Sequence, residues 1–309
     1  MPARTRAELA RSRAGPVRAE RLRLPSGASR RAAFLAIAGS SIAQVIGNRD
    51  GARAGDDPEY VHQMRVGLRR LRSALRLFRG HEHLLSRRDR QALKSLGRVL
   101  GGVRDLDVFT GDIAGAGLAP AARRAALARL GPHHALAREK LRAWLDGPQH
   151  ARLEQRLALA LAADGGTRGA AILPFAARAL SRAHRPLARA ARDVAALEEP
   201  ALHALRIEVK RARYAAEFFT TLGWEARARR YVRALAALQD ALGRINDLAS
   251  GRVLLTQTGI ATRAAAQLMR EWQAAAQAAR ARLPQLAANA VACAGYWQDA
   301  KEKTHVRSR

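Results

Sequence analysis

Apolar residues recur every three or four positions along most of this chain, which is the spacing that one face of an α-helix produces. Alternation of apolar and polar residues, which half-buried strands require, is absent, and alanine, leucine and arginine favour helices. An Asp57-Pro58 pair marks a helix start, because aspartate caps the first turn and proline fits its first position. The pattern predicts an all-α chain with helices near residues 30–46, 57–79, 86–106, 120–146, 148–163, 172–197, 200–222, 224–255, 260–283 and 285–301.

The strongest interruption of the helical pattern is Asp-Gly-Gly-Thr-Arg-Gly at residues 164–169, a composition typical of linkers. It predicts a first helical half over residues 29–164 and a second over residues 170–301. Residues 1–28 are rich in arginine and contain three prolines, and we expect them to form a disordered basic leader. Residues 302–309 are expected to form a frayed tail.

The two halves share a duplicated sequence pattern. Residues 61–72 (VHQMRVGLRRLR) return 141 positions later as residues 202–213 (LHALRIEVKRAR). Residues 100–106 (LGGVRDL) correspond to residues 242–248 (LGRINDL) at an offset of 142. Two matches in the same order and nearly the same register indicate an internal duplication of a unit much longer than a solenoid repeat.

Helical geometry turns the repeated segment into two parallel rows of side chains. The apolar stripe of the first copy follows a 3-4-3-4-3 spacing and contains Val61, Met64, Leu68, Leu71, Leu75 and Phe78. One residue later, the same spacing gives what we call the first basic row, namely His62, Arg65, Arg69, Arg72 and Arg76. Since one residue is a rotation of about 100°, this row lies beside the core stripe and not opposite it. The second basic row comprises His203, Arg206, Lys210 and Arg213.

Charge then indicates what these rows bind. The 55 Lys and Arg against 26 Asp and Glu leave a net charge of +29, a self-repulsion that an anionic partner would offset. Most charged helical faces are solvated and paired with nearby carboxylates, but acids are nearly missing between Glu59 and Arg79. Cations about 5 Å apart along a helix suit a linear polyanion, and arginine binds its oxygens in a bidentate manner. The rows therefore predict polyanion binding.

The doubled H-x-x-R-x-x-x-[RK]-R-x-R helix, together with residues 102–108 (GVRDLDV), resembles the CHAD domain, the conserved-histidine α-helical domain, over residues 30–301. The resemblance implies two four-helix bundles related by a pseudo-twofold axis, with basic helices facing a positive channel between them. It also implies binding of inorganic polyphosphate and association with polyphosphate granules. Carried over by position, the polyphosphate-facing residues would be His62, Arg65, Arg69, Arg70, Arg72, His203, Arg206, Lys210, Arg211 and Arg213.

Further candidates come from the flanks of these rows. Arg104 and Asp105 belong to the second motif, where Asn246 replaces the arginine in the second copy. The residues expected to extend the groove or the first row are Arg76, Lys94 and Arg98. The carboxylates Asp105, Asp107 and Asp247 could suggest a metal, but within a cationic region we expect them to orient arginines. His133-His134 indicates a surface loop or a kinked helix.

Other functional classes have weaker support in the sequence. Catalysis through phosphohistidine would need a nucleotide site, and neither a P-loop nor a glycine-rich kinase loop is present, so we expect no enzyme, metal or cofactor. A nucleic-acid-binding basic protein is the main alternative, but only Tyr214 is interleaved with the basic rows, so base stacking is poorly provided for and only weak binding is expected. Granule-associated proteins are further candidate partners.

Location is constrained by what the sequence contains. No apolar run reaches the roughly 18 residues that a membrane helix needs. The single cysteine, Cys293, fits a reducing compartment, so we expect a cytoplasmic protein. The segment 29–35 (SRRAAFL) faintly resembles a twin-arginine export signal, but a first core helix after a basic leader explains it more simply.

Overall fold

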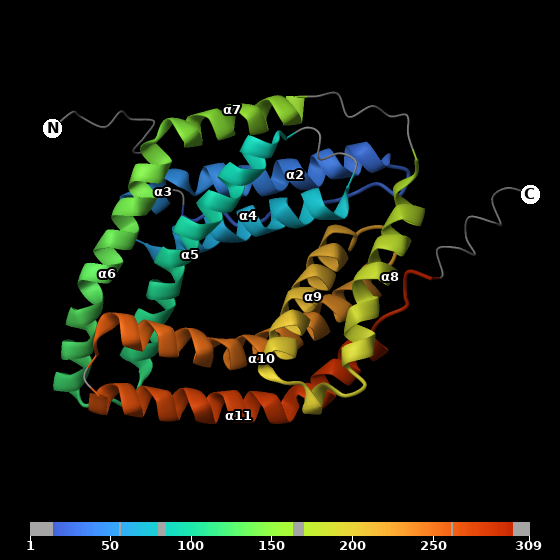
Figure 1. Ribbon diagram of the computed structural model, residues 1–309. Helices are drawn as coiled ribbons and strands as arrows, with labels where there is room; N and C mark the ends of the chain where they lie inside the picture. Colours follow the sequence, from blue (N-terminus) through green and yellow to red (C-terminus); the bar gives the residue numbers. More distant parts are fainter. Residues whose placement is uncertain (1–14, 56, 80–84, 163–169, 261, 299–309) are drawn as a thin grey trace, which may run out of the picture. The chain divides into compact units, whose positions relative to one another are not determined.

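The structure is a computed structural model that describes residues 15–55, 57–79, 85–162, 170–260 and 262–298. Within these ranges every named element is a helix, and the only strand-like pairing is an isolated bridge between Ser29 and Ala171 (Figure 1). The prediction of an all-α fold is confirmed. None of the described helices has the length and apolar character that crossing a membrane requires.

The chain divides into two compact units. Of the described residues, the first unit holds those within 15–21, 34–115 and 127–162, and the second holds those within 22–33, 116–126 and 170–298. The helices that precede the 163–169 segment are α2 (Arg30–Gly47), α3 (Arg49–Ala54), α4 (Pro58–Leu77), α5 (Arg87–Gly115), α6 (Pro120–Asp146) and α7 (Pro148–Ala162). Those that follow it are α8 (Ile172–Ala190), the 3-10 turn η2 (Val194–Ala196), α9 (Glu199–Phe218), α10 (Glu225–Thr258) and α11 (Thr262–Ala292).

Local capping explains where the helices around the first basic row begin. The Asp57 side chain accepts a hydrogen bond from the Glu59 backbone N–H at 2.8 Å, and Pro58 opens α4, as predicted. At the start of α5, the Ser86 backbone N–H donates to Asp89 at 2.8 Å and the Asp89 N–H donates to the Ser86 hydroxyl at 3.2 Å. This reciprocal arrangement satisfies two backbone donors and fixes the first turn of α5.

Several helices are longer than the sequence pattern predicted. Helix α5 continues to Gly115, beyond the end predicted near residue 106, and α11 passes through Pro284, where a break between two helices was predicted. Helix α6 also contains an internal proline, Pro132. Both prolines lie on exposed faces. Water can therefore reach the backbone carbonyl that loses its helical partner at each proline, which lowers the cost of an internal proline.

Part of the predicted leader is ordered against helices. The Val17 backbone exchanges two hydrogen bonds with the Asn48 side chain, at 3.0 and 2.8 Å. Leu24 is 4% exposed, and its N–H donates to the Thr221 hydroxyl at 2.9 Å. The disordered leader predicted for residues 1–28 is therefore wrong for residues 15–28. Val17 and Leu24, which lie between arginines of this segment, hold it against the helices. Residues 1–14 and the predicted tail at 302–309 lie outside the described residues.

The apolar stripe of α4 is buried as predicted, and Phe78 ends it with a ring contact to Phe34 at 5.5 Å. In the second unit Phe219 contacts Phe175 at 6.2 Å. Both residues of this second pair lie 141 positions after those of the first, which is the offset found between the repeated segments. The two contacts fit the predicted duplication, which stays a prediction.

A close approach of α4 to α2 fixes the other side of the row-bearing helix. A Cβ atom on Gly67 would lie 3.0 Å from the Ser41 carbonyl oxygen and 3.1 Å from side-chain atoms of Gln44 and Val45. The backbone oxygen cannot rotate away as a side chain can. The absence of a side chain at Gly67 therefore allows α2 and α4 to pack together.

We predict that Gly67→Ala lowers the free energy of unfolding by about 1–3 kcal/mol, because overpacking at Ser41 outweighs alanine's higher helix propensity. The matched control is Gly102→Ala on α5, where a Cβ would have no neighbouring atom within 4 Å. That change should raise the stability by about 0.5–1 kcal/mol. Urea unfolding followed by circular dichroism measures both, and equal stabilities for the two variants would contradict the close packing of α4 on α2.

Candidate anion-binding site

The first basic row lies beside the buried apolar stripe of α4. His62, Arg65 and Arg69 are half-buried, whereas Arg72 and Arg76 are exposed. Arg69 and Arg72 form no hydrogen bond or ion pair with any residue that the structure describes. The row thus presents cationic groups next to the core, with two guanidinium groups whose hydrogen-bonding capacity the described protein does not use.

Two glycines of α5 make room for the guanidinium groups of this row. The Arg72 Nη1 atom lies 3.3 Å from the position that a Cβ on Gly97 would take, and Arg65 Nη1 lies 3.6 Å from the corresponding position at Gly101. Arg65 also approaches Asp105, with 3.9 Å between Nη2 and Oδ1. Neither glycine was among the predicted site residues, although their four-residue spacing places them on one side of α5.

His62 lies in the electrostatic field of this cluster. Burial lowers the pKa of His62 below its ordinary value of 6.5, and the charge of Arg104 on α5 lowers it next most strongly. Arg69 and Arg65 lower the pKa further, while Glu59 opposes them. The charge of Arg104 on α5 therefore acts on the motif histidine of α4, and the joint contact of these two residues with a ligand stays a prediction.

The exposed face of α5 adds further cations. Lys94 and Arg98 are exposed and lie one helical turn apart. Asp105, seven residues after Arg98, falls on the same face of α5 and reaches toward Arg65. Lys94 and Arg98 therefore lie on a face of α5 that borders the first basic row, and their contribution to ligand binding stays a prediction.

The second basic row has more partners within its own unit. The Nδ1 atom of His203 lies 3.0 Å from Oδ1 of Asn246, the residue that replaces the arginine of the first copy. Arg213 donates to Gln239 of α10 at 3.0 Å and forms an ion pair with Glu217 at 3.1 Å. His203 is exposed, while Arg206 and Lys210 are half-buried. The contact between the histidine and α10 thus repeats the relation of the first-row histidine to α5, with an amide in place of a cation.

The structure does not place every predicted contact residue on these rows. Arg70 is only 8% exposed, and Arg211 forms an ion pair with Glu208 on its own helix. Each follows a row residue by one position and so lies about 100° away from the row. Asp247 is exposed on α10. The channel that the resemblance implies between the halves stays a prediction.

A buried carboxylate connects α5 to α6 beside the first row. Asp107 Oδ1 lies 2.6 Å from His134 Nε2 and 3.5 Å from Arg138 Nη2, and the Asp107 side chain is 6% exposed. Arg138 also donates from Nε to His134 Nδ1 at 3.3 Å. His134 therefore lies within helix α6, and of the two alternatives left open for His133-His134 the surface loop is wrong. Asp107 orients a histidine as well as an arginine, whereas only an arginine was expected.

No group of three or more His, Cys, Asp or Glu side chains in the described ranges has the arrangement of a metal site. The single cysteine, Cys293, is partly exposed and not in a disulfide. The chemical groups that the site offers are thus guanidinium, ammonium and imidazole donors. Such a set binds oxyanions.

The chain is similar in sequence and fold to proteins of the CHAD family. The family model of the CHAD domain matches residues 36–256. The crystal structure of the CHAD domain from the plant Ricinus communis is 31% identical, covers 89% of this chain and 96% of its own, and superposes with a TM-score of 0.74. PptA from Streptomyces chartreusis shares the fold at 18% identity, with coverage of 85% and 99% and a TM-score of 0.57. No curated protein sequence matches.

We predict that Asp107→Asn destabilises the protein by about 3 kcal/mol, because it leaves the poorly exposed Arg138 without its carboxylate. The matched control is Asp105→Asn, two residues earlier on α5, where the carboxylate is 61% exposed and lies 3.9 Å from Arg65. The control should change stability by no more than about 0.5 kcal/mol. Thermal unfolding measures both, and a loss at Asp105 as large as that at Asp107 would show that the α5–α6 connection is not specific.

Proposed function

Since this chain belongs to the CHAD family, we propose that it binds inorganic polyphosphate through the two basic rows without carrying out a reaction on it. One observation carries the proposal. On the first row, Arg69 and Arg72 have no hydrogen-bonding or ion-pairing partner among the described residues, and they lie one turn apart beside a histidine whose pKa is held low. An unsatisfied cationic field of this kind favours an anionic ligand.

The form of the rows supports a linear ligand. Row residues three and four positions apart stand about 5–6 Å from each other along the helix, so one chain of phosphates can contact several of them in succession. Each guanidinium can bind two phosphate oxygens. A compact anion would engage only one or two residues of a row. The proposed ligand is therefore a polyphosphate long enough to span a row.

Single-stranded nucleic acid is the second candidate ligand, and the structure has fewer features that would bind it. Sequence-tolerant binding of single strands depends on exposed aromatic rings on which bases stack. Tyr214, the aromatic residue interleaved with the second basic row, is 5% exposed and stacks on Phe218 at 6.4 Å. We therefore assign nucleic acid a weak, charge-driven role. A cytoplasmic location on polyphosphate granules, with granule proteins as partners, is part of the same proposal.

Replacement of Arg65, Arg69 and Arg72 by Gln tests the proposal. It should weaken binding of long polyphosphate at least about tenfold and reduce the slope of log affinity against log salt by about 2, because three phosphate contacts no longer release counterions. Fluorescence anisotropy over a salt series measures both quantities. The corresponding change of Arg206, Lys210 and Arg213 should have a smaller effect, because Arg213 is already paired with Glu217.

The matched control replaces Arg178, Arg182 and Arg185 of α8 by Gln. These arginines are exposed, lie on one face of a helix and have no partner in the described structure, so the net charge falls equally. The control should lower affinity by less than about threefold. Equal losses in the row variant and the control would indicate diffuse electrostatics and refute a defined site.

His62 should make polyphosphate binding depend on pH. In the unbound protein its pKa is lowered by burial and by Arg104, Arg69 and Arg65, with Glu59 opposing them. A bound polyanion favours the protonated imidazole and raises this pKa. A group whose pKa rises on binding strengthens binding as pH falls from its bound value to its unbound value. Affinity should therefore increase from about pH 8 to about pH 6.

Variants separate this effect from general titration. Replacing both row histidines, His62→Gln with His203→Gln, should flatten the pH dependence and leave affinity near pH 8 almost unchanged. The control His133→Gln removes an exposed histidine of α6 that belongs to neither row and should keep the slope. A slope that persists in the double variant would mean that the row histidines do not contact the ligand.

A further inference from the structure

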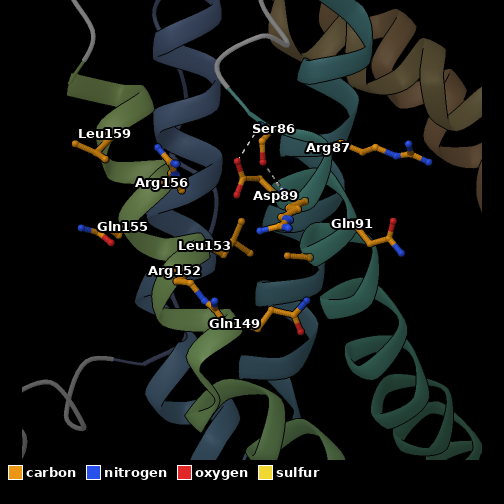
Figure 2. Close-up of a pocket in the computed structure, with 12 residues that line it drawn as sticks. Ser86, Arg87, Asp89, Gln91, Gln149, Arg152, Leu153, Gln155, Arg156 and Leu159 are labelled. Atoms are coloured by element: carbon orange, nitrogen blue, oxygen red, sulfur yellow. Dashed lines mark hydrogen bonds between the residues drawn. The ribbon is translucent and has the colours of Figure 1, made fainter.

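We infer that the first unit holds a second, separate anion site, in the groove between the start of α5 and helix α7, and that it takes a compact oligophosphate such as triphosphate. The groove has a volume of about 1200 Å³ and is lined by residues of 86–92 and 149–159 (Figure 2). It lies wholly within one unit. The site goes beyond the polyphosphate rows because it involves none of their residues.

Four arginines from two helices line this groove. Arg87 and Arg88 come from α5, and Arg152 and Arg156 come from successive turns of α7. Arg152 donates through Nε to the Pro148 carbonyl at 3.1 Å, which leaves its two terminal nitrogens available. None of the four forms an ion pair with a carboxylate among the described residues. Like charges gathered in a concavity create a field that attracts an anion.

The one carboxylate in the lining has another role. Asp89 accepts the Ser86 N–H at 2.8 Å, in the reciprocal cap that begins α5, and Figure 2 shows both bonds of this pair as dashed lines. The cap directs the carboxylate toward the backbone of Ser86. Asp89 also balances at most one of the four arginine charges. The groove therefore keeps a net positive charge.

The rest of the lining suits a small, highly charged ligand. Gln149 and Gln155 add amide groups that can donate hydrogen bonds to phosphate oxygens. Leu153 and Ala92 close the floor and are 3% and 5% exposed. No aromatic ring is among the described residues that line the groove, so nothing there would stack on a nucleotide base. Charge from two facing helices, with amides beside it, fits a compact phosphate cluster better than an extended chain.

Helix geometry separates this groove from the first basic row. The row contacts α5 at Gly97, which lies nine residues after Arg88 and so about 180° around the helix from it. In Figure 2 the side chains of Arg152 and Leu153, which line the groove, point toward α5. An anion in the groove and a chain on the row therefore lie on opposite flanks of α5.

Isothermal titration calorimetry with tripolyphosphate and with long-chain polyphosphate tests the inference on the full chain. The groove variant replaces Arg88, Arg152 and Arg156 by Gln, and the control replaces Arg129, Arg233 and Arg270, which are exposed and do not line the groove. The groove variant should lose tripolyphosphate affinity at least about tenfold, because charge-assisted hydrogen bonds are lost, and keep long-chain affinity within about threefold. The control should change neither by more than about threefold.

The row variant Arg65→Gln, Arg69→Gln, Arg72→Gln separates this inference from the proposed function. It should retain tripolyphosphate binding while losing long-chain binding. Tripolyphosphate binding that is unchanged in the groove variant, or reduced only as much as in the control, would overturn the groove site and leave the rows untouched. An affinity for long-chain polyphosphate that is unchanged in the row variant would overturn the row proposal. It would not affect the inference of a groove site. Circular dichroism of each variant confirms that the helices remain.

Discussion

The repulsion among cations held beside the core of α4 is the constraint that shapes this protein. The first basic row lies about 100° from a fully buried apolar stripe, so its inner members, His62, Arg65 and Arg69, are only half-exposed to water. Water screens such groups less well than surface charges. Two features of α5 accommodate these cations. Glycines leave space for the guanidinium groups, and the carboxylate of Asp105 approaches Arg65. The lowered pKa of His62 reflects both its burial and the remaining positive field.

The two rows meet this constraint differently. In the second unit, Asn246 takes the position of the arginine near the histidine, and Gln239 and Glu217 bond Arg213. Each of these contacts occupies a hydrogen-bond donor of His203 or Arg213 that could otherwise donate to a ligand. The first unit instead keeps Arg104 near His62. The first row should therefore contribute more of the binding energy, and the second row should be the more rigid of the two before a ligand arrives.

Local pattern predicted the helices and the rows, because both depend on residues close in sequence. The Asp57-Pro58 start followed from the capping preferences of the two residues, and the buried α4 stripe followed from its spacing. The link from Asp107 to His134 did not, since 27 residues separate them and only the packing of α5 on α6 brings them together. Arg70 looked equivalent to its row neighbours, but its burial depends on what packs against that side of α4. The continuation of α6 through Pro132 likewise depends on solvent access at one face.

Competition between long polyphosphate and DNA tests the central claim most directly. Labelled polyphosphate is bound to the protein at about physiological salt, and unlabelled single- or double-stranded DNA is added at equal phosphate concentration. Matching the phosphate concentration removes bulk charge as a variable, so the outcome depends on how the rows fit each polymer. We predict that DNA displaces little polyphosphate, because the rows offer closely spaced guanidinium groups and, in the part of the chain that the structure describes, no exposed stacking ring. DNA that binds as tightly as polyphosphate, or more tightly, would contradict the assignment of polyphosphate as the ligand.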